Sequence, residues 1–333
     1  TQAKTLFPYT TLFRSLSSLF SSLALFGDVG SNGVSYYDMG KFNIWPYMRY
    51  DQAVYGTIDQ AKFQMFFESL ADALKANYMD TLNLSFAQVC DITNYFENNF
   101  TWDGDKEINF SRQDAIGMEL WQIQSGQHKN QIDPSIDLLK LLVEGLHKYG
   151  IKVNLSFGGA DASIAEFILG ESDVQDQMQK LLSFMDKYQI DGLDFDIESV
   201  LSQETLSPLK TLFQGLRQAG KQLSLTVMMG LKDWPEGCLK PLFFDDQGNR
   251  IFADLFTGLN FMAYSETTYY LDATSDSWGV IPWIDIIGKE NVSKVRFGFY
   301  DHVPYEGSFP RSLRGEKAAE AYKNLLSNLE SAG

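Results

Sequence analysis

Short apolar runs alternate with longer amphipathic segments from Gly40 onward. The runs are continuous or nearly continuous in apolar residues, which is typical of strands covered by helices, and the longer segments have helical periodicity. Two helical segments end at Gly150 and Gly220, and a new apolar run follows each glycine. The expected strands cover residues 42–47, 81–87, 152–157, 192–197, 223–229, 258–264 and 295–300, and the expected helices cover residues 58–75, 135–149, 163–169, 174–188, 208–219 and 283–287.

This alternation of strand and helix predicts a parallel sheet, and a chain of 333 residues accommodates one α/β barrel. Such a barrel has eight strands, whereas the sequence offers seven. A last helix is expected over residues 315–330, and the sequence stops at Gly333, where the eighth strand would follow. We therefore expect a (β/α)8 TIM barrel that is incomplete because its eighth strand is missing at the C-terminus. The barrel is then either open or a fragment, and the fragment is the preferred interpretation.

An incomplete barrel has a physical consequence for the strands at its gap. Without an eighth strand, the first and seventh strands would each present an unpaired edge. We therefore expect the chain on its own to be unstable or weakly active.

Two parts of the chain stand apart from the alternating pattern. Residues 5–15 read like translated sequencing-adapter sequence, and residues 16–26 form a serine-interrupted apolar run that is faintly similar to a signal peptide. Residues 1–33 are therefore treated as a non-core N-terminal segment, either an artefact or a signal-like run, and residues 34–333 as the barrel. Residues 91–134, polar and aromatic, form an insertion after the second strand.

Composition narrows the classes of partner. The formal net charge is −16 without a basic stripe, which argues against nucleic acid and against anionic membrane surfaces. No stretch is long and apolar enough to span a bilayer. Two cysteines are too few for a disulfide framework, and three histidines share no ligand spacing, so we expect neither a metal nor a cofactor. An acidic surface suits a protein that acts on a neutral or cationic substrate.

Carboxylates crowd the fourth expected strand. Asp194, Asp196 and Glu198 share parity, because strand residues alternate between faces, so all three point into the barrel while Phe195 and Ile197 point toward the helices. Like charges this close raise some pKa values, so that at least one proton is retained or shared. Glu198 falls at the C-terminal end of the strand, where barrels place catalytic groups.

The alternative interpretation of this run is a solvated acidic edge or a calcium-binding loop. Calcium loops interleave Asp with Gly and Asn, whereas the interleaved residues here are Phe195 and Ile197. A buried strand is therefore the preferred interpretation.

Three motifs together carry a family resemblance. Residues 191–198 resemble the D-x-x-D-x-D-x-E motif of family 18 glycoside hydrolases, the chitinase family, residues 156–159 resemble its S-x-G-G motif, and residues 262–264 resemble its M-x-Y motif. In this resemblance Ser156 hydrogen-bonds the inner carboxylates, while Gly158 and Gly159 permit a tight strand exit. The likeness covers residues 40–333, with residues 91–134 unassigned.

The resemblance implies a retaining mechanism in which the N-acetyl group of the substrate is the nucleophile. Glu198 would protonate the glycosidic oxygen, and Asp196 would accept the acetamido N–H and orient its carbonyl oxygen. Asp194 would share a proton with Asp196 and help to raise the pKa of Glu198. Tyr264 would donate its hydroxyl to the acetamido oxygen. Asp191 has the opposite parity, so we expect a structural role at the start of the strand.

The resemblance also implies substrate contacts. Trp45 and Phe86, on the first two expected strands, match aromatic positions that line the cleft, and Met262 belongs to the M-x-Y motif. Ser265 stands where the family often has Asp or Asn, which changes one contact to the sugar. The family's Trp at the end of the eighth strand has no counterpart, because that strand is absent.

These observations predict a glycoside hydrolase of the chitinase type that cleaves β-1,4 linkages in chitin or N-acetylglucosamine oligomers. Two alternatives stay open: an endo-β-N-acetylglucosaminidase acting on N-glycans, and a non-catalytic chitinase-like sugar-binding protein. The intact M-x-Y motif favours a chitinase over the first, and the presence of Glu198 favours an enzyme over the second. We expect a secreted monomer whose partner is a glycan containing N-acetylglucosamine.

Overall fold

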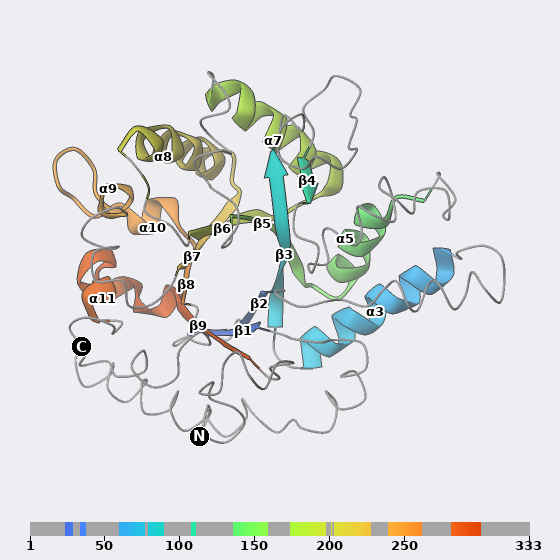
Figure 1. Ribbon diagram of the computed structural model, residues 1–333. Helices are drawn as coiled ribbons and strands as arrows, with labels where there is room; N and C mark the ends of the chain where they lie inside the picture. The colour runs from blue at the N-terminus through green and yellow to red at the C-terminus, as the bar shows by residue number, and fades with distance from the viewer. Residues whose placement is uncertain are drawn as a thin grey trace, which may run out of the picture.

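The computed structural model describes residues 24–28, 34–37, 60–76, 79–89, 108–110, 136–158, 174–197, 201, 203–227, 239–261 and 281–300. Their strands form one curled sheet with helices on its outer side (Figure 1). No helix in these ranges is long and apolar enough to cross a membrane.

Parallel strands make up most of the sheet. In spatial order they are β2 (Val34–Tyr37), β3 (Met79–Val89), β5 (Lys152–Gly158), β6 (Gly192–Ile197), β7 (Gln222–Val227), β8 (Gly258–Phe261) and β9 (Val295–Tyr300). The short strand β4 (Ile108–Phe110) pairs antiparallel with β3 outside this series. The described strands and helices therefore form an incomplete (β/α)8 barrel, with seven of its parallel strands.

The strand β1 (Ala24–Asp28) lies in the place of the eighth parallel strand. It pairs antiparallel with β2 on one side and with β9 on the other. The predicted unpaired edge of the seventh expected strand, residues 295–300, is therefore wrong, whereas the first expected strand, residues 42–47, lies outside the described residues. This strand lies within residues 1–33, which the sequence analysis set apart from the barrel as an artefact or a signal-like run, and its pairing makes residues 24–28 part of the sheet.

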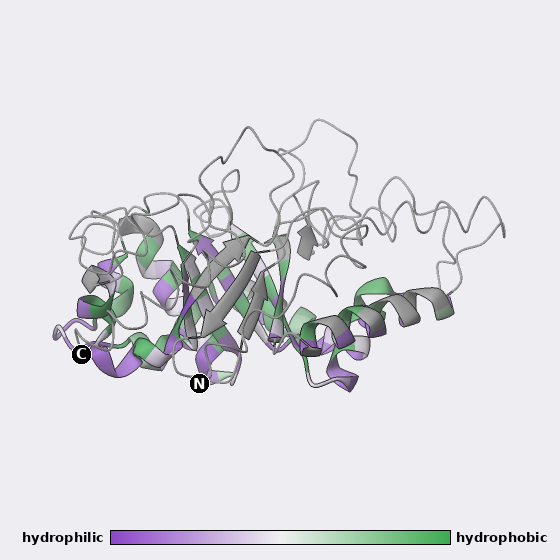
Figure 2. Cartoon of the chain, turned by 90° about the horizontal axis from the view of Figure 1, so that it is seen from below, coloured by the Kyte–Doolittle hydropathy of each residue, from purple (hydrophilic) through white to green (hydrophobic). Residues whose placement is uncertain are grey.

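The helices follow their strands around the barrel. They are α3 (Gln60–Ala76), α5 (Leu138–Lys148), α7 (Val174–Tyr188), α8 (Gln203–Gln218), α9 (Lys240–Phe243), α10 (Phe252–Leu255) and α11 (Ile281–Ile287), with a 3-10 helix η3 (Lys289–Lys294). The helices to the left and right of the strands in Figure 2, around the outside of the curled sheet, show both apolar and polar stretches, as amphipathic helices do. The helix α8 begins before the predicted start at Pro208, which lies inside it and removes one main-chain donor near the N-terminal end.

Three helices end in the same way before the next strand. Gly150 and Gly220 have φ values of 76° and 80°, and the main-chain N–H groups of Ile151 and Lys221 reach back to helix carbonyls over 3.1 and 3.0 Å. The predicted helix stops at both glycines are confirmed. Gln189 has the same left-handed conformation, with φ 57°, at the end of α7, although it has a side chain.

The two faces of the barrel strands differ in chemistry. Outward-facing side chains pack against the helices; Phe195, for example, lies 4.6 Å from Phe213 of α8 between ring centroids. The inner face instead carries the buried polar residues of the described strands. These are Thr81, Asn83, Asn154, Ser156, Asp194, Asp196, Ser224, Thr226 and Asn260. The main hydrophobic core therefore lies between sheet and helices, and the barrel interior is polar.

Most predicted strands and helices within the described ranges are found. The strands β6 and β9 and the helix α7 have the predicted bounds, and β5 extends one residue further, to Gly158. The expected strand at residues 42–47 and the expected helices at 163–169 and 315–330 lie outside the described residues. The sequence analysis did not predict β1, β2, β4, α9, α10 or η3, which are all short.

Candidate active site

Strand register brings the polar interior residues to one level of the barrel. Asp194 of β6 pairs with Ser156 of β5 and with Ser224 of β7. Thr226 of β7 pairs in turn with Asn260 of β8. Because paired residues of neighbouring parallel strands point to the same face, these five side chains converge on the barrel axis.

The carboxylate of Asp194 is the centre of this convergence. Its Oδ2 accepts a hydrogen bond from the hydroxyl of Ser156 over 2.9 Å, and its Oδ1 accepts one from Ser224 over 2.5 Å. The hydroxyl of Thr226 lies 3.0 Å from both oxygens, and the amide Nδ2 of Asn260 donates to Oδ1 over 3.1 Å. Four donors from three strands therefore surround a carboxylate that has no exposed surface.

Burial and hydrogen bonding act on Asp194 in opposite directions. Burial raises the pKa of Asp194 to about 6, because water no longer solvates the charged form. The hydrogen bonds from Ser224, Ser156 and Thr226, followed by the positive charge of Arg296, oppose part of that rise. Asp194 therefore titrates close to neutrality, where a buried carboxyl group can hold or release a proton.

Asp196 lies on the same inner face, two residues further along β6. It is 1% exposed and pairs with Gly158 on one side and Thr226 on the other. Gly158 ends β5 with φ 107°, a conformation that side chains rarely adopt, which fits the tight strand exit expected of the S-x-G-G motif. Two buried carboxyl groups on one face of one strand can share a proton.

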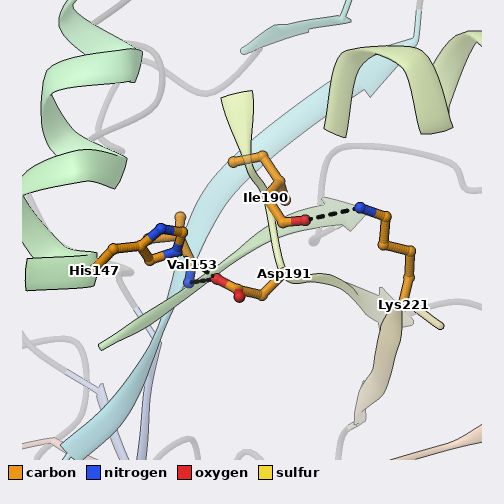
Figure 3. A network of polar contacts seen from close by, with 5 residues as sticks. All are labelled: His147, Val153, Ile190, Asp191 and Lys221. Atoms are coloured by element: carbon orange, nitrogen blue, oxygen red, sulfur yellow. Dashed lines mark hydrogen bonds and ion pairs between the residues drawn. The ribbon is translucent and has the colours of Figure 1, made fainter. Parts of the chain in front are cut away.

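Asp191 lies at the other end of β6, away from this pair. Its Oδ2 accepts a hydrogen bond from the main-chain N–H of Val153 over 2.8 Å and lies 2.8 Å from Nε2 of His147, in the last turn of α5 (Figure 3). Lys221 donates to the carbonyl of Ile190 over 3.3 Å beside it. Asp191 thus joins a helix and two strands at the N-terminal side of the sheet.

Arg296 adds a positive charge to the interior. It pairs with Asn260 between β9 and β8, so it shares the inner face. Its guanidinium occupies the space that a side chain at Gly258 would need, which explains a glycine at the start of β8. The positive charge of Arg296 favours the charged form of Asp194.

Several predicted site residues lie outside the described residues. They are Glu198, Tyr264, Met262, Trp45 and Gly159. Phe86 belongs to β3, but its side chain is not among the described parts. The assignments of these six residues stay predictions. Ser156, Gly158, Asp191, Asp194 and Asp196 are described, and the structure brings Ser156, Gly158, Asp194 and Asp196 together and Asp191 to the far end of the strand.

Sequence reasoning missed part of the network around Asp194. It gave no role to Ser224, Thr226, Arg296 or Asn260. Ser224 and Thr226 could have been predicted, because they are polar residues at alternating positions of an otherwise apolar run. This alternation places both on one face of their strand. The described part of the chain contains no group of three or more His, Cys, Asp and Glu side chains placed to hold a metal ion.

Several solved structures are similar to this chain. One is a GH18 chitinase from Pseudoalteromonas aurantia, at 16% identity and a TM-score of 0.42, over 65% of this chain and 71% of that one. A second is a Group IV chitinase from Ostrinia furnacalis, at 14% identity and a TM-score of 0.41, over 66% of this chain and 57% of that one. A third is an endo-beta-N-acetylglucosaminidase from Cordyceps militaris, at 18% identity and a TM-score of 0.35, over 56% and 53%.

This chain spans little more than half of the length of the last two structures. A comparison with curated protein sequences found no match. The sequence profile of the glycosyl hydrolases family 18 matches residues 53–270, a segment that contains β3 and β5 to β8 with both buried aspartates. The chain therefore belongs to family 18 of the glycosyl hydrolases.

Proposed function

We propose that this chain hydrolyses β-1,4 linkages in chitin or N-acetylglucosamine oligomers. The observation that carries the proposal is the buried pair of Asp194 and Asp196 on the inner face of β6, a strand that ends at Ile197. Glu198 follows directly in the sequence, at the C-terminal end of a barrel strand, where such barrels carry their catalytic groups. Membership of family 18 supports the same reaction class.

The proposed reaction has two steps. In the first, Glu198 gives its proton to the glycosidic oxygen while the acetamido carbonyl oxygen of the substrate attacks the anomeric carbon, so that the leaving sugar departs as an alcohol. In the second, Glu198 takes a proton from water, whose oxygen attacks the anomeric carbon and releases the acetamido group. The configuration at the anomeric carbon is retained because it is inverted twice.

The two aspartates would support both steps. Asp196 would accept the acetamido N–H, which orients the carbonyl oxygen and stabilises the positive charge that develops on the cyclic intermediate. Asp194 lies behind it, held by donors from β5, β7 and β8. Tyr264 would donate its hydroxyl to the acetamido oxygen, a role taken from the M-x-Y motif.

Hydrolysis of N-acetylglucosamine oligomers, followed by chromatography of the products, tests this proposal. We expect the wild type to shorten the oligomers and Glu198→Gln to lose at least about a hundredfold in kcat, as general acid–base groups do. The matched control is Glu144→Gln, an exposed glutamate on α5 that pairs with Lys140, which should keep wild-type activity. Full activity in Glu198→Gln would contradict the assignment of the acid.

A second substrate separates chitinase from N-glycan activity. An N-glycan with a chitobiose core is offered to the same proteins under the same conditions. Cleavage of the oligomers with little cleavage of the N-glycan supports the proposal. Cleavage of the N-glycan alone would replace it by an endo-β-N-acetylglucosaminidase, and binding of oligomers without cleavage of either substrate would indicate a sugar-binding protein.

A further inference from the structure

The hydrogens around Asp194 have directions that follow from simple counting. The amide of Asn260 has two N–H groups, and its Nδ2 contacts both Oδ1 of Asp194 and Oγ1 of Thr226, each over 3.1 Å. Because a hydroxyl has a single hydrogen, Thr226 can accept from Asn260 and must then use its own hydrogen for Asp194. Its 3.0 Å contacts with the two carboxylate oxygens fit that direction.

The same counting shows which form of Asp194 the network favours. Ser156 and Ser224 can also donate to the carboxylate, so that four donors meet its two oxygens. A neutral carboxyl group would carry its own hydrogen toward one of these donors, and that donor would then lose its acceptor. All four groups can donate to Asp194 at once only when its carboxyl group is charged.

We propose that Asn260 is a positioning residue that fixes the hydroxyl of Thr226 as a donor and thereby keeps Asp194 as a carboxylate. Above about pH 6, where Asp194 is charged, the proton that the proposed reaction needs is then held further along the strand. This inference rests on the proposed function for its meaning in catalysis. The interaction itself is a property of the folded chain and can be measured without substrate.

Other charged groups that face Asp194 are few among the described residues. Asp196 lies on its own strand, and Arg296 reaches the interior from β9. The residues of β5, β7 and β8 that contact it, Ser156, Ser224, Thr226 and Asn260, do not titrate in this range. A change at Asn260 therefore acts on Asp194 without removing a charge.

Two substitutions test the idea through the pH dependence of kcat/KM on N-acetylglucosamine oligomers. Asn260→Leu removes the amide at similar volume, and Thr226→Val removes the hydroxyl alone. We expect the acidic limb of the profile to move up by about one pH unit in each, since one hydrogen bond to a charged group is lost. Thr226→Ser keeps the hydroxyl and should keep the wild-type limb.

A buried asparagine elsewhere supplies the matched control. Asn291 is 5% exposed and donates to the carbonyl of Ile287 over 2.8 Å, outside the barrel interior. Asn291→Leu should lower the unfolding midpoint without moving the acidic limb. An unmoved limb in both Asn260→Leu and Thr226→Val, with the proteins folded, would overturn the proposal.

A readout without substrate separates this inference from the proposed function. The unfolding midpoint in urea is measured from pH 4 to pH 8 for wild type, Thr226→Val and Asn260→Leu, and again for all three on an Asp194→Asn background. We expect the pH dependence to shift upward by about one unit only where Asp194 is present. An equal shift on both backgrounds would contradict the role of Asn260, whereas an inactive wild type with the expected shift would contradict only the proposed function.

Discussion

Nε2 of His147 lies 2.8 Å from Oδ2 of Asp191, and this contact ties the last turn of α5 to the start of β6. The same oxygen accepts the main-chain N–H of Val153 on β5. The main-chain N–H of Asp191 returns a bond to the carbonyl of Val153 over 2.9 Å. The strand that carries the two buried aspartates is therefore anchored at the end opposite to the proposed catalytic residue.

Replacing Asp191 should lower the free energy of unfolding more than replacing His147 does. Asp191→Ala leaves the N–H of Val153 without its acceptor, and we expect a loss of about 2 kcal/mol in the free energy of unfolding. His147→Ala keeps that bond and should cost about 1 kcal/mol. Urea unfolding at pH 7 measures both, and an equal cost for the two variants would show that Val153 does not depend on Asp191.

An exposed ion pair at the same side of the sheet is the control for this comparison. Asp186 accepts from Lys221 over 2.8 Å, with 72% of the aspartate side chain exposed. Asp186→Ala should change the free energy of unfolding by less than about 1 kcal/mol, because solvent screens such pairs.

The raised pKa of Asp194 predicts a pH dependence of stability with a definite sign. Between pH 4 and pH 6 the folded chain keeps a proton on Asp194 that the unfolded chain has released, so stability falls as pH rises and the loss is complete above about pH 6. A rise from 3.8 to about 6 corresponds to about 3 kcal/mol. Asp194→Asn should reduce the fall in unfolding free energy between pH 4 and pH 7 by that amount. Equal falls in the unfolding free energy of the wild type and of Asp194→Asn would contradict a raised pKa of Asp194.

An exposed aspartate gives the opposite sign and serves as a comparison. The side chain and main-chain N–H of Asn249 hold the pKa of Asp245 below its usual value. The contribution of Asp245 to the free energy of unfolding is therefore present above the usual carboxyl pKa and is lost as the pH falls through the lowered pKa. Asp245→Asn should leave the change in unfolding free energy between pH 4 and pH 7 nearly as in the wild type. Below pH 4 the unfolding free energy of the variant should depend less steeply on pH.

Gln189 occupies a backbone conformation that suits glycine. Its φ of 57° costs a residue with a side chain about 1 kcal/mol, and the equivalent positions after α5 and α8 are Gly150 and Gly220. We expect Gln189→Gly to raise the free energy of unfolding by up to about 1 kcal/mol. Gly220→Ala should lower it by about 1 kcal/mol through backbone strain alone, because no atom lies within 4 Å of the added Cβ. Thermal unfolding of both variants checks the pair, and a destabilised Gln189→Gly would show that its side chain contributes more than its backbone costs.

The sequence predicted those parts of the fold that depend on local pattern. The strand β6 is continuously buried, so its apolar and acidic residues had to alternate between a helix-facing and an interior side, and Asp194 and Asp196 could be placed on one face. The helix stop at Gly150 was predictable because glycine is the usual residue there, whereas the same turn at Gln189 was not.

The local sequence pattern does not predict which residues of neighbouring strands lie side by side. Asn260 reaches Asp194 only because β8 pairs with β7 in the register that aligns Asn260 with Thr226, and register depends on the whole ring rather than on one strand. The same reason hides Arg296, whose place beside Gly258 follows from the β8–β9 pairing. Parity within a strand could be deduced, but partners across strands could not.

The antiparallel strand β1 changes what is expected of the stability of the chain. Because Ala24–Asp28 pairs with both β2 and β9, both edges of the parallel series are paired, and we expect cooperative unfolding of the described sheet. Leu25→Pro removes a main-chain donor and clashes within a strand that is paired on both sides, so it should cost about 3 kcal/mol or more. Leu25→Val, a strand-favouring change, should cost less than about 1.5 kcal/mol. Circular dichroism during urea unfolding measures both, and a harmless proline at this position would show that β1 does not close the barrel.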